Sequence, residues 1–258
     1  MLSVLRNVKW IKCRDLYFCN HPPEGTIGED VQYFLQSTKQ LRGSQPFLTS
    51  LIDLTIDVDS IFNRIKKNVA YEIRRAKNKD LVAIRILDAE KDEDRAVFIK
   101  FYDRFAASKG LAPSNKEKLK QLAKENGLLM SVSIVEQNRN NWLSAHAYIC
   151  DGNRARLLYS GSDISMHDTK DRQLIGRANK NMHWHMIQFF KENNYKEYDF
   201  GGLGSQEEVK NIAEFKLSFG GREVLEYNFL KGISIKGMIA ISVFKLLTKF
   251  KKIRANIL

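Results

Sequence analysis

The sequence predicts an α/β protein, with a mixed and mostly antiparallel central sheet, flanking helices and an amphipathic helix at the C-terminus. Two observations lead to this fold class. Runs of strand composition stand before, between and after runs of helical periodicity, which is the order expected of one mixed sheet. The 258 residues are 43% hydrophobic and 28% charged, so the chain can bury a sizeable core and stay soluble.

The first half of the chain alternates strand and helix patterns. Residues 9–18 alternate loosely and predict a strand, whereas residues 30–40 have a helical look. Residues 47–57 are rich in leucine and isoleucine, which favours a strand. Residues 61–79 carry an apolar side chain at every fourth position and predict one long helix. A strand at 81–87 follows.

The second half continues this alternation, with three successive strands joined by polar turns at 138–141 and 151–153. Its predicted elements are a helix at 90–108, a helix at 116–125, strands at 128–135, 142–150 and 154–160, a helix at 176–193, a strand at 195–200, a helix near 207–215 and a strand at 222–230.

The chain is strongly basic, with a formal net charge of +12. This charge favours an anionic partner: nucleic acid, a nucleotide-bearing cofactor, a nucleotide sugar or an acidic membrane surface. A basic surface without a dedicated ligand is the alternative. The three cysteines, Cys13, Cys19 and Cys150, match neither a disulfide framework nor a zinc pattern, so we expect reduced thiols, no metal and a cytoplasmic protein. The sequence predicts no leader peptide and no transmembrane run.

Two double-glycine motifs near the C-terminus are the most informative feature of the sequence. Residues 198–202 read YDFGG, and residues 215–221 read FKLSFGG. Glycine permits backbone torsions and close approaches that other residues forbid. A lysine between two such pairs indicates a chain folded tightly about something bound.

These motifs and the order of elements resemble a known acyltransferase fold. The element order resembles the GNAT acyltransferases, and YDFGG…FKLSFGG resembles the end of the Fem-type GNAT domains, which add amino acids to peptidoglycan precursors. The helix containing Arg74, Arg75 and Ala76 is similar to the first half of that group. The resemblance covers roughly residues 47–230 and implies a single GNAT-like domain. We expect an N-terminal extension at 1–46, the acyltransferase domain at 47–232 and a basic amphipathic helix at 233–258.

A short motif at Gln173–Ala178 predicts binding of an acyl-CoA donor. Gln173, Gly176, Arg177 and Ala178 match the pattern Q/R-x-x-G-x-G/A, with which GNAT enzymes hold the pyrophosphate of coenzyme A; Ile175 lies within it. We expect the motif to open the long helix, because a helix N-terminus offers free N–H groups and a positive dipole end. The alternative is an ordinary helix start with a glycine hinge.

Lys216 and Asp199 are the first two candidate catalytic residues. The Fem-type resemblance implies that Lys216 stabilises the oxyanion that develops on the acyl group. A lysine paired with Asp199 or Glu214 is the structural alternative. Asp199 could orient Lys216 or an acceptor amine, or it could cap the turn at Gly201 and Gly202, which is the favoured interpretation.

Strand residues supply three further candidates. His146 is a candidate general base, because an unperturbed histidine has a pKa of about 6.5. Tyr159 is a candidate acid for a leaving thiolate, and Ser160 is a candidate acceptor-binding residue. Packing in the core is the alternative for His146 and Tyr159. His183 and His185 lie two residues apart, on different helix faces, and are expected to be structural.

Two basic segments suggest partners. The helix face that includes Arg75 could bind a nucleotide-linked acceptor or the acceptor end of tRNA, or it could be a solvated face. Residues 233–258 combine an apolar stripe with lysines and predict an anchor on an anionic membrane, with a domain-covering helix or a dimer seam as alternatives.

The combined prediction is an N-acyltransferase that moves an acyl group from acyl-CoA to an amine. The acceptor would be an amino sugar or another nucleotide-linked or lipid-linked precursor of a cell-envelope polysaccharide. A Fem-like enzyme that uses aminoacyl-tRNA is one alternative. A non-catalytic GNAT-fold module that binds a partner at the inner membrane surface is another. The sequence sets neither the acyl chain nor the oligomeric state.

Overall fold

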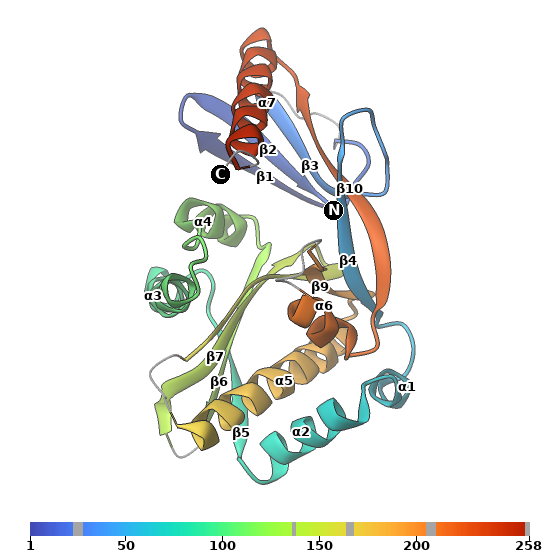
Figure 1. Ribbon diagram of the computed structural model, residues 1–258, viewed down its shortest axis with the longest axis vertical. Helices are drawn as coiled ribbons and strands as arrows, with labels where there is room; N and C mark the ends of the chain where they lie inside the picture. The colour runs from blue at the N-terminus through green and yellow to red at the C-terminus, as the bar shows by residue number, and fades with distance from the viewer. Residues whose placement is uncertain (23–27, 136–137, 164–167, 205–209, 256–258) are drawn as a thin grey trace. The chain divides into compact units, whose positions relative to one another are not determined.

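The computed structural model describes residues 1–22, 28–135, 138–163, 168–204 and 210–255, with side chains left undescribed at 138–140 and 247–255. The described residues form ten strands and seven helices (Figure 1). The chain divides into two compact units. Unit 1 contains Met1–Phe47 and Leu225–Leu258, and unit 2 contains Leu48–Val224. Strands β4 (Gln45–Asp53) and β10 (Arg222–Gly232) contain residues of both units.

Unit 2 is a mixed sheet covered by helices. Its strands are ordered β4-β9-β8-β7-β6-β5, and among these neighbours only β8 and β9 pair in parallel in the described residues. Its elements are α1 (Val58–Asn63), α2 (Lys67–Asn78), β5 (Val82–Leu87), α3 (Asp92–Ser108), α4 (Lys116–Lys124), β6 (Leu128–Val135), β7 (Asn138–Cys150), β8 (Arg154–Ser162), α5 (Thr169–Glu192), β9 (Glu197–Gly202) and α6 (Lys210–Leu217).

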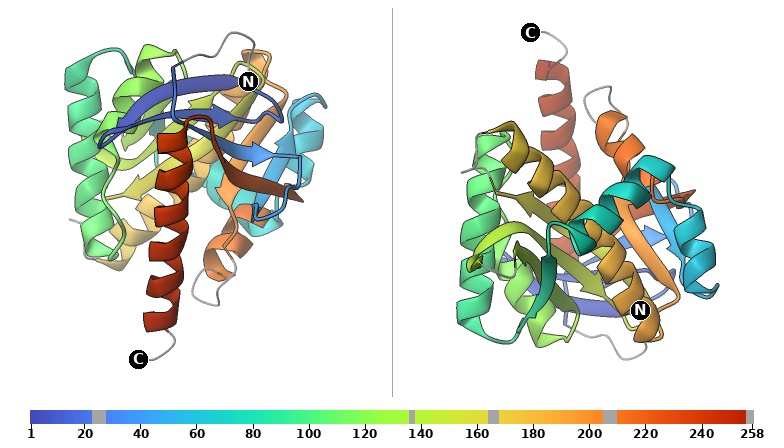
Figure 2. Two further views of the ribbon diagram at one scale, coloured as in Figure 1. Left: turned by 90° about the horizontal axis from the view of Figure 1, so that it is seen from above. Right: turned by 90° about the horizontal axis from the view of Figure 1, so that it is seen from below.

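Helices lie on both faces of this sheet. Helix α5 contacts β5 to β8 and packs alongside α2, as Figure 2 shows in its right-hand view. Helices α3 and α4 contact β6, β7 and β8 and lie on the other face (Figure 1). The main core lies under α5, where Tyr148, Tyr198, Phe190 and Phe200 are fully buried. The mixed, mostly antiparallel sheet with flanking helices confirms the predicted fold class.

Unit 1 is a smaller sheet that carries the last helix. Its strands are ordered β1-β2-β3-β10, with β1 at Leu2–Val8, β2 at Ile11–Tyr17 and β3 at Val31–Ser37. Strands β2 and β3 pair in parallel, whereas β1 with β2 and β3 with β10 pair antiparallel. Helix α7 (Ile235–Ala255) contacts β2. None of the helices in the described ranges combines the length and apolarity that a membrane crossing requires.

The helix predicted at 30–40 is wrong, because this segment is strand β3. Val31, Phe34 and Leu35 imitate helical spacing, and the strand is buried on both faces, so it shows no alternation. Two of its polar residues form internal hydrogen bonds: Gln32 donates to Glu29 at 2.9 Å, and Gln36 donates to Glu226 at 2.9 Å. Buried glutamines with such partners do not reveal the strand in a sequence pattern.

The single helix predicted at 61–79 is also wrong, because the chain breaks between α1 and α2. Lys66 has an extended ψ of 137°, and its N–H donates to the Ser218 carbonyl at 2.9 Å instead of continuing a helix. Likewise, residues 138–141 are not a turn, since β7 begins at Asn138. The apolar side chains recur every four residues through both α1 and α2. Periodicity alone therefore could not locate the break between the two helices.

The second glycine pair is shaped by the protein's own backbone. Gly220 has φ +79°, and a Cβ there would lie 2.5 Å from the Arg64 Cβ and 2.7 Å from the Arg64 carbonyl oxygen. A Cβ on Gly221 would collide with Ser50 of β4. Both glycines therefore let β10 begin against the α1–α2 connection and β4.

We expect Gly220→Ala to destabilise the protein by roughly 2–4 kcal/mol, because the strain of a positive φ adds to a clash with backbone. Chemical denaturation measures this loss. Gly152→Ala is the matched control: its φ is +83°, but nothing lies within 4 Å of a Cβ there. Equal losses in the two variants would contradict the packing explanation.

Candidate active site

The candidate site lies where strands β8 and β9 stop pairing. The parallel pairs run from Arg154↔Glu197 to Arg156↔Asp199, although β8 continues to Ser162. Beyond these pairs β9 ends in Gly201 and Gly202, and α6 follows after residues outside the described ranges. The ends of parallel strands that separate in this way are a common place for ligand sites in α/β sheets.

Lys216 reaches this strand end from α6. Its Nζ donates a hydrogen bond of 2.6 Å to the Gly202 carbonyl, and its side chain is half-buried. Burial lowers the pKa of Lys216 to about 8, while the negative charge of Asp199 opposes that shift and the positive charge of Arg156 adds to it. The structure thus places a partly desolvated ammonium group at the end of β9.

Asp199 is fully buried, and its carboxylate accepts hydrogen bonds from Arg154, Gly201 and Thr49. Arg154 donates to it from Nε at 3.0 Å and from Nη2 at 2.6 Å, and the Gly201 N–H donates at 2.7 Å. The Thr49 hydroxyl of β4 also donates to this carboxylate. Gly201 adopts φ +72°, and a Cβ there would lie 2.9 Å from the Leu157 carbonyl oxygen. These contacts fit the favoured interpretation of Asp199 as the cap of the glycine turn.

His146 lies inside a buried chain of polar side chains. Its Nδ1 is 2.8 Å from the Tyr148 hydroxyl, and its Nε2 is 2.7 Å from Asn179 Oδ1. Burial lowers the pKa of His146 to about 3, so the ring is neutral at physiological pH. Both ring nitrogens are thus engaged within the core, which fits the packing alternative for this residue.

The same chain continues to a residue that sequence reasoning set aside. The Tyr148 and Tyr198 hydroxyls are 3.2 Å apart, and the Tyr198 hydroxyl is 2.7 Å from His183 Nδ1. With Asn179 Oδ1 as an acceptor, His146 Nε2 must donate to it. Tyr148 then donates to His146, Tyr198 to Tyr148, and His183 Nδ1 to Tyr198.

This direction leaves His183 with its basic lone pair on Nε2. The ring packs among Phe200, Phe215 and Phe219, and burial lowers its pKa well below the usual value, with Lys216 contributing. His183 is therefore next to the site although its sequence spacing suggested only a structural residue. The spacing of two residues between His183 and His185 argues against a metal site shared by the two. It could not predict that tyrosines on the sheet orient the His183 ring.

Tyr159 and Ser160 lie on β8. The Tyr159 hydroxyl accepts a hydrogen bond of 3.0 Å from the Asn115 N–H, and its ring lies 4.6 Å from that of Tyr102 of α3. Burial raises the pKa of Tyr159. Tyr159 therefore points to the α3 face of the sheet, whereas Ser160 pairs with His146 in the β7–β8 ladder.

The predicted start of the long helix at Gly176 is wrong. Helix α5 begins at Thr169, where Asp168 caps it and accepts a hydrogen bond of 2.8 Å from the Asp171 N–H. Gln173–Ala178 therefore lies inside the helix, where backbone N–H groups bond to carbonyls four residues earlier. The free amides on which the pyrophosphate prediction depended are absent from this motif.

The side chains of this motif have other surroundings. Ile175 and Ala178 are buried in the core, Gln173 is exposed, and Gly176 has nothing within 4 Å of a Cβ. Arg177 forms a two-point ion pair with Asp80, with Nε at 2.5 Å and Nη2 at 3.1 Å. Through apolar packing and this ion pair, the motif holds α5 against α2 and β5.

Helix α2 presents a basic face outside the core. Arg75 is exposed, and Arg74 lies with its guanidinium 4.8 Å from the centre of the Phe62 ring. Four further cations on or beside this helix are exposed: Lys66, Lys67, Lys77 and Lys79. The structure thus concentrates positive charge on one surface of unit 2.

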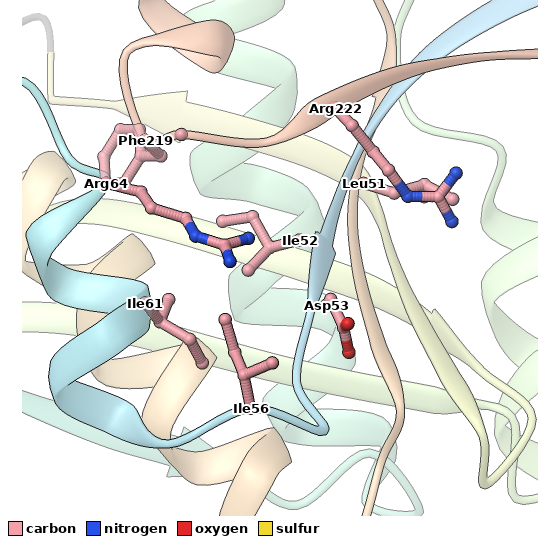
Figure 3. A pocket seen from close by; sticks show the side chains of 9 residues that line it. Leu51, Ile52, Asp53, Ile56, Ile61, Arg64, Phe219 and Arg222 are labelled. Atoms are coloured by element: carbon pink, nitrogen blue, oxygen red, sulfur yellow. The ribbon is translucent and has the colours of Figure 1, made fainter.

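A small pocket lies between β4, α1 and the second glycine pair (Figure 3). Its volume is about 50 Å³, and Arg64, Asp53 and Arg222 are its charged lining residues. Ligand clefts usually have volumes of about 300–1,000 Å³, so this pocket is too small for an acyl donor.

The fold defined by these elements is that of the GNAT-like acyltransferases, and within them it is of the Fem type. The model of the FemAB family matches residues 108–227, a segment that contains β6 to β9, α5 and α6. The matched segment therefore includes Lys216, Asp199 and both histidines of the buried chain. The resemblance predicted from YDFGG…FKLSFGG is confirmed.

Solved structures share this fold at low sequence identity. The crystal structure of FemX is 12% identical, with a TM-score of 0.57, and the match covers 71% of this chain and 61% of FemX. The C-terminal domain of an Agrobacterium fabrum protein described as a lysylphosphatidylglycerol synthetase is 10% identical, with a TM-score of 0.54, over 84% of this chain and 72% of that one. L-PGS from Bacillus licheniformis is 10% identical, with a TM-score of 0.51, over 81% and 71%. No curated protein matches the sequence.

Proposed function

We propose that this chain is an aminoacyltransferase of cell-envelope synthesis, which moves an aminoacyl group from tRNA to an amine of an envelope precursor. The observation that carries the proposal is the half-buried Lys216 ammonium at the end of β9, within the segment that matches the FemAB family. The Fem-type resemblance implies both the reaction and the aminoacyl-tRNA donor.

Lys216 would act on the carbonyl of the transferred group. The acceptor amine attacks the carbonyl carbon of the ester, and the carbonyl oxygen becomes an oxyanion beside the ammonium group. The C–O bond to the tRNA ribose then breaks, and the proton lost by the amine ends on the ribose oxygen. Since His146 is neutral and both its nitrogens are engaged, positioning of the two substrates would supply most of the catalysis.

The surface charge of unit 2 supports a tRNA donor over acyl-CoA. The exposed basic face of α2 offers several cations to phosphates, as nucleic-acid binding requires. The motif predicted to hold coenzyme A, by contrast, lies inside α5. We therefore expect charged tRNA to bind and its affinity to fall steeply with salt.

Donor choice is tested by thermal shift and by transfer. Charged tRNA should raise the melting temperature, whereas coenzyme A should leave it unchanged. Labelled aminoacyl groups should pass from tRNA to a precursor fraction of envelope extract. Arg74→Glu with Arg75→Glu should weaken tRNA binding, and Lys116→Glu with Lys120→Glu on α4 is the control. Stabilisation by coenzyme A alone would reject the tRNA donor.

The pKa of Lys216 predicts a pH dependence. Because its folded pKa of about 8 lies below the ordinary value of 10.5, the ammonium form dominates below pH 8 and is lost as pH rises through that value. The contribution of Lys216 to the rate should therefore fall above about pH 8. A Lys216→Arg variant that retains activity should keep it to higher pH, which pH–rate profiles of kcat/KM measure. Superimposable profiles would contradict a role for this charge.

A further inference from the structure

Unit 1 carries an apolar groove beside α7. The groove has a volume of about 530 Å³, which falls within the range of ligand clefts. Strand and helix residues both line it, among them Ile11, Tyr33, Phe229, Ile239, Val243 and Phe244. All of its lining residues belong to unit 1.

The first turn of α7 is fixed to the strands of the same unit. Ser234 donates to the Asp30 carboxylate at 2.7 Å, and Lys236 forms an ion pair with it at 3.3 Å. Gly237 packs against the Asp30 carbonyl so closely that a Cβ would collide. Ala240 and Ile241 then pack on Ile11 and its neighbours. The groove is therefore bounded by a helix whose place in unit 1 is set by specific contacts.

Large apolar side chains at this groove are exposed to solvent. Trp10 is 60% exposed, and Val243 and Phe244 are 51% and 53% exposed. Ile239, which also lines the groove, is 56% exposed. A cluster of this kind indicates an interaction surface rather than scattered surface residues.

The charges around the groove are all positive among the described residues that line it. They are Lys9, Arg42 and Lys245, together with Arg6, which forms an ion pair with Asp15. Lys236 lies 5.3 Å from the centre of the Trp10 ring, and no acidic residue follows Glu226 in the sequence. Tryptophan beside lysine is typical of a protein surface at a membrane interface.

We propose that this groove receives an acyl chain of an anionic bilayer phospholipid, with the surrounding cations at the lipid headgroups. Unit 1 would then dock on the membrane surface without crossing it. Apolar burial and attraction to anionic lipid act together in such binding. A second copy of the chain is a poorer occupant, because two equally basic rims would repel each other. This inference does not depend on the proposed transferase activity.

Vesicle binding and fluorescence quenching test the proposal on the full chain. The protein should float with vesicles that contain phosphatidylglycerol and not with pure phosphatidylcholine. Phe244→Asp should lower the partition coefficient by about ten-fold or more, because the aromatic side chain no longer enters the acyl region. Lys9→Glu with Arg42→Glu should lower it by a similar factor, about ten-fold. Lys116→Glu with Lys120→Glu in unit 2 makes the same charge change and should have little effect.

Brominated acyl chains report on depth. They should quench wild-type tryptophan fluorescence, and Trp10→Phe should remove this quenching, because Trp10 is the tryptophan placed at the groove. Flotation without quenching, or equal losses in both charge variants, would indicate adsorption by net charge alone and overturn the proposal. A concentration-dependent dimer that Phe244→Asp dissociates would assign the groove to a second copy and also overturn it. Circular dichroism of each variant verifies that the fold is retained.

Discussion

Replacing Lys216 with alanine is expected to lower kcat/KM for aminoacyl transfer by about 100- to 1,000-fold. The reason is that the ammonium group would meet negative charge only in the transition state, so its loss affects the barrier more than substrate binding. The side chain is half-buried and donates to a backbone carbonyl, so little solvent competes for it. Steady-state kinetics with charged tRNA measure the effect.

The same helix supplies the matched control for this variant. Lys210 also lies on α6, but it is exposed, and Lys210→Ala should leave kcat/KM near the wild-type value. The loss of one hydrogen bond to Gly202 should cost Lys216→Ala only about 1 kcal/mol of stability. Full activity in Lys216→Ala would reject the oxyanion role of this residue. Absence of aminoacyl transfer by the wild-type protein would favour a non-catalytic module with a GNAT-like fold.

Removing the partner of the buried Asp199 carboxylate should produce the largest loss of stability. We expect Arg154→Met to destabilise the protein by roughly 3–5 kcal/mol, because it leaves a buried charge without its ion partner. Arg154 and Asp199 are both buried, and two hydrogen bonds to one carboxylate oxygen join them. Urea denaturation at neutral pH gives the free energy of unfolding.

An exposed ion pair of the same type serves as the comparison. Arg222 lies 3.5 Å from Glu197, and its side chain is 65% exposed, so Arg222→Met should cost at most about 1 kcal/mol. If the two variants lost similar stability, the buried pair would not be the main support of the glycine turn. Asp199→Asn separates structure from chemistry: a variant that folds and keeps its rate would remove Asp199 from the catalytic candidates.

The sequence could predict the elements of unit 2 whose patterns are local. The helices at α3 and α4, the strands β6 and β8, and the part of β7 after residue 141 follow from periodicity and turn residues. Strand β3 was not predicted, because it is buried on both faces and its glutamines form hydrogen bonds inside the protein. The break before α2 was not predicted, because the Lys66 N–H bonds to the Ser218 carbonyl, which lies about 150 residues away in the chain.

The candidate site was predictable only as far as motifs reach. The glycine pairs located Lys216 and the turn at Asp199, since such torsions leave a mark in composition. The start of α5 could not be located in this way, because Asp168 is one of several acidic residues that could cap a helix there. The position of His183 next to the site could not be predicted, because its ring is oriented by Tyr198 on β9, a contact that no spacing within α5 can show.

The buried series of hydroxyl, ring and amide groups has a polarity, from His183 on α5 through Tyr198 and Tyr148 to His146 and Asn179. Each member between the two ends donates one hydrogen bond and accepts one, so inverting a single link would require every other link to invert with it. With a change at one position, such as Tyr148→Phe, the series would therefore no longer fix the tautomer of the His183 ring, which lies two members away. Among relatives we expect these five positions to be retained or exchanged as a set, and proton NMR should detect one slowly exchanging ring N–H on each histidine.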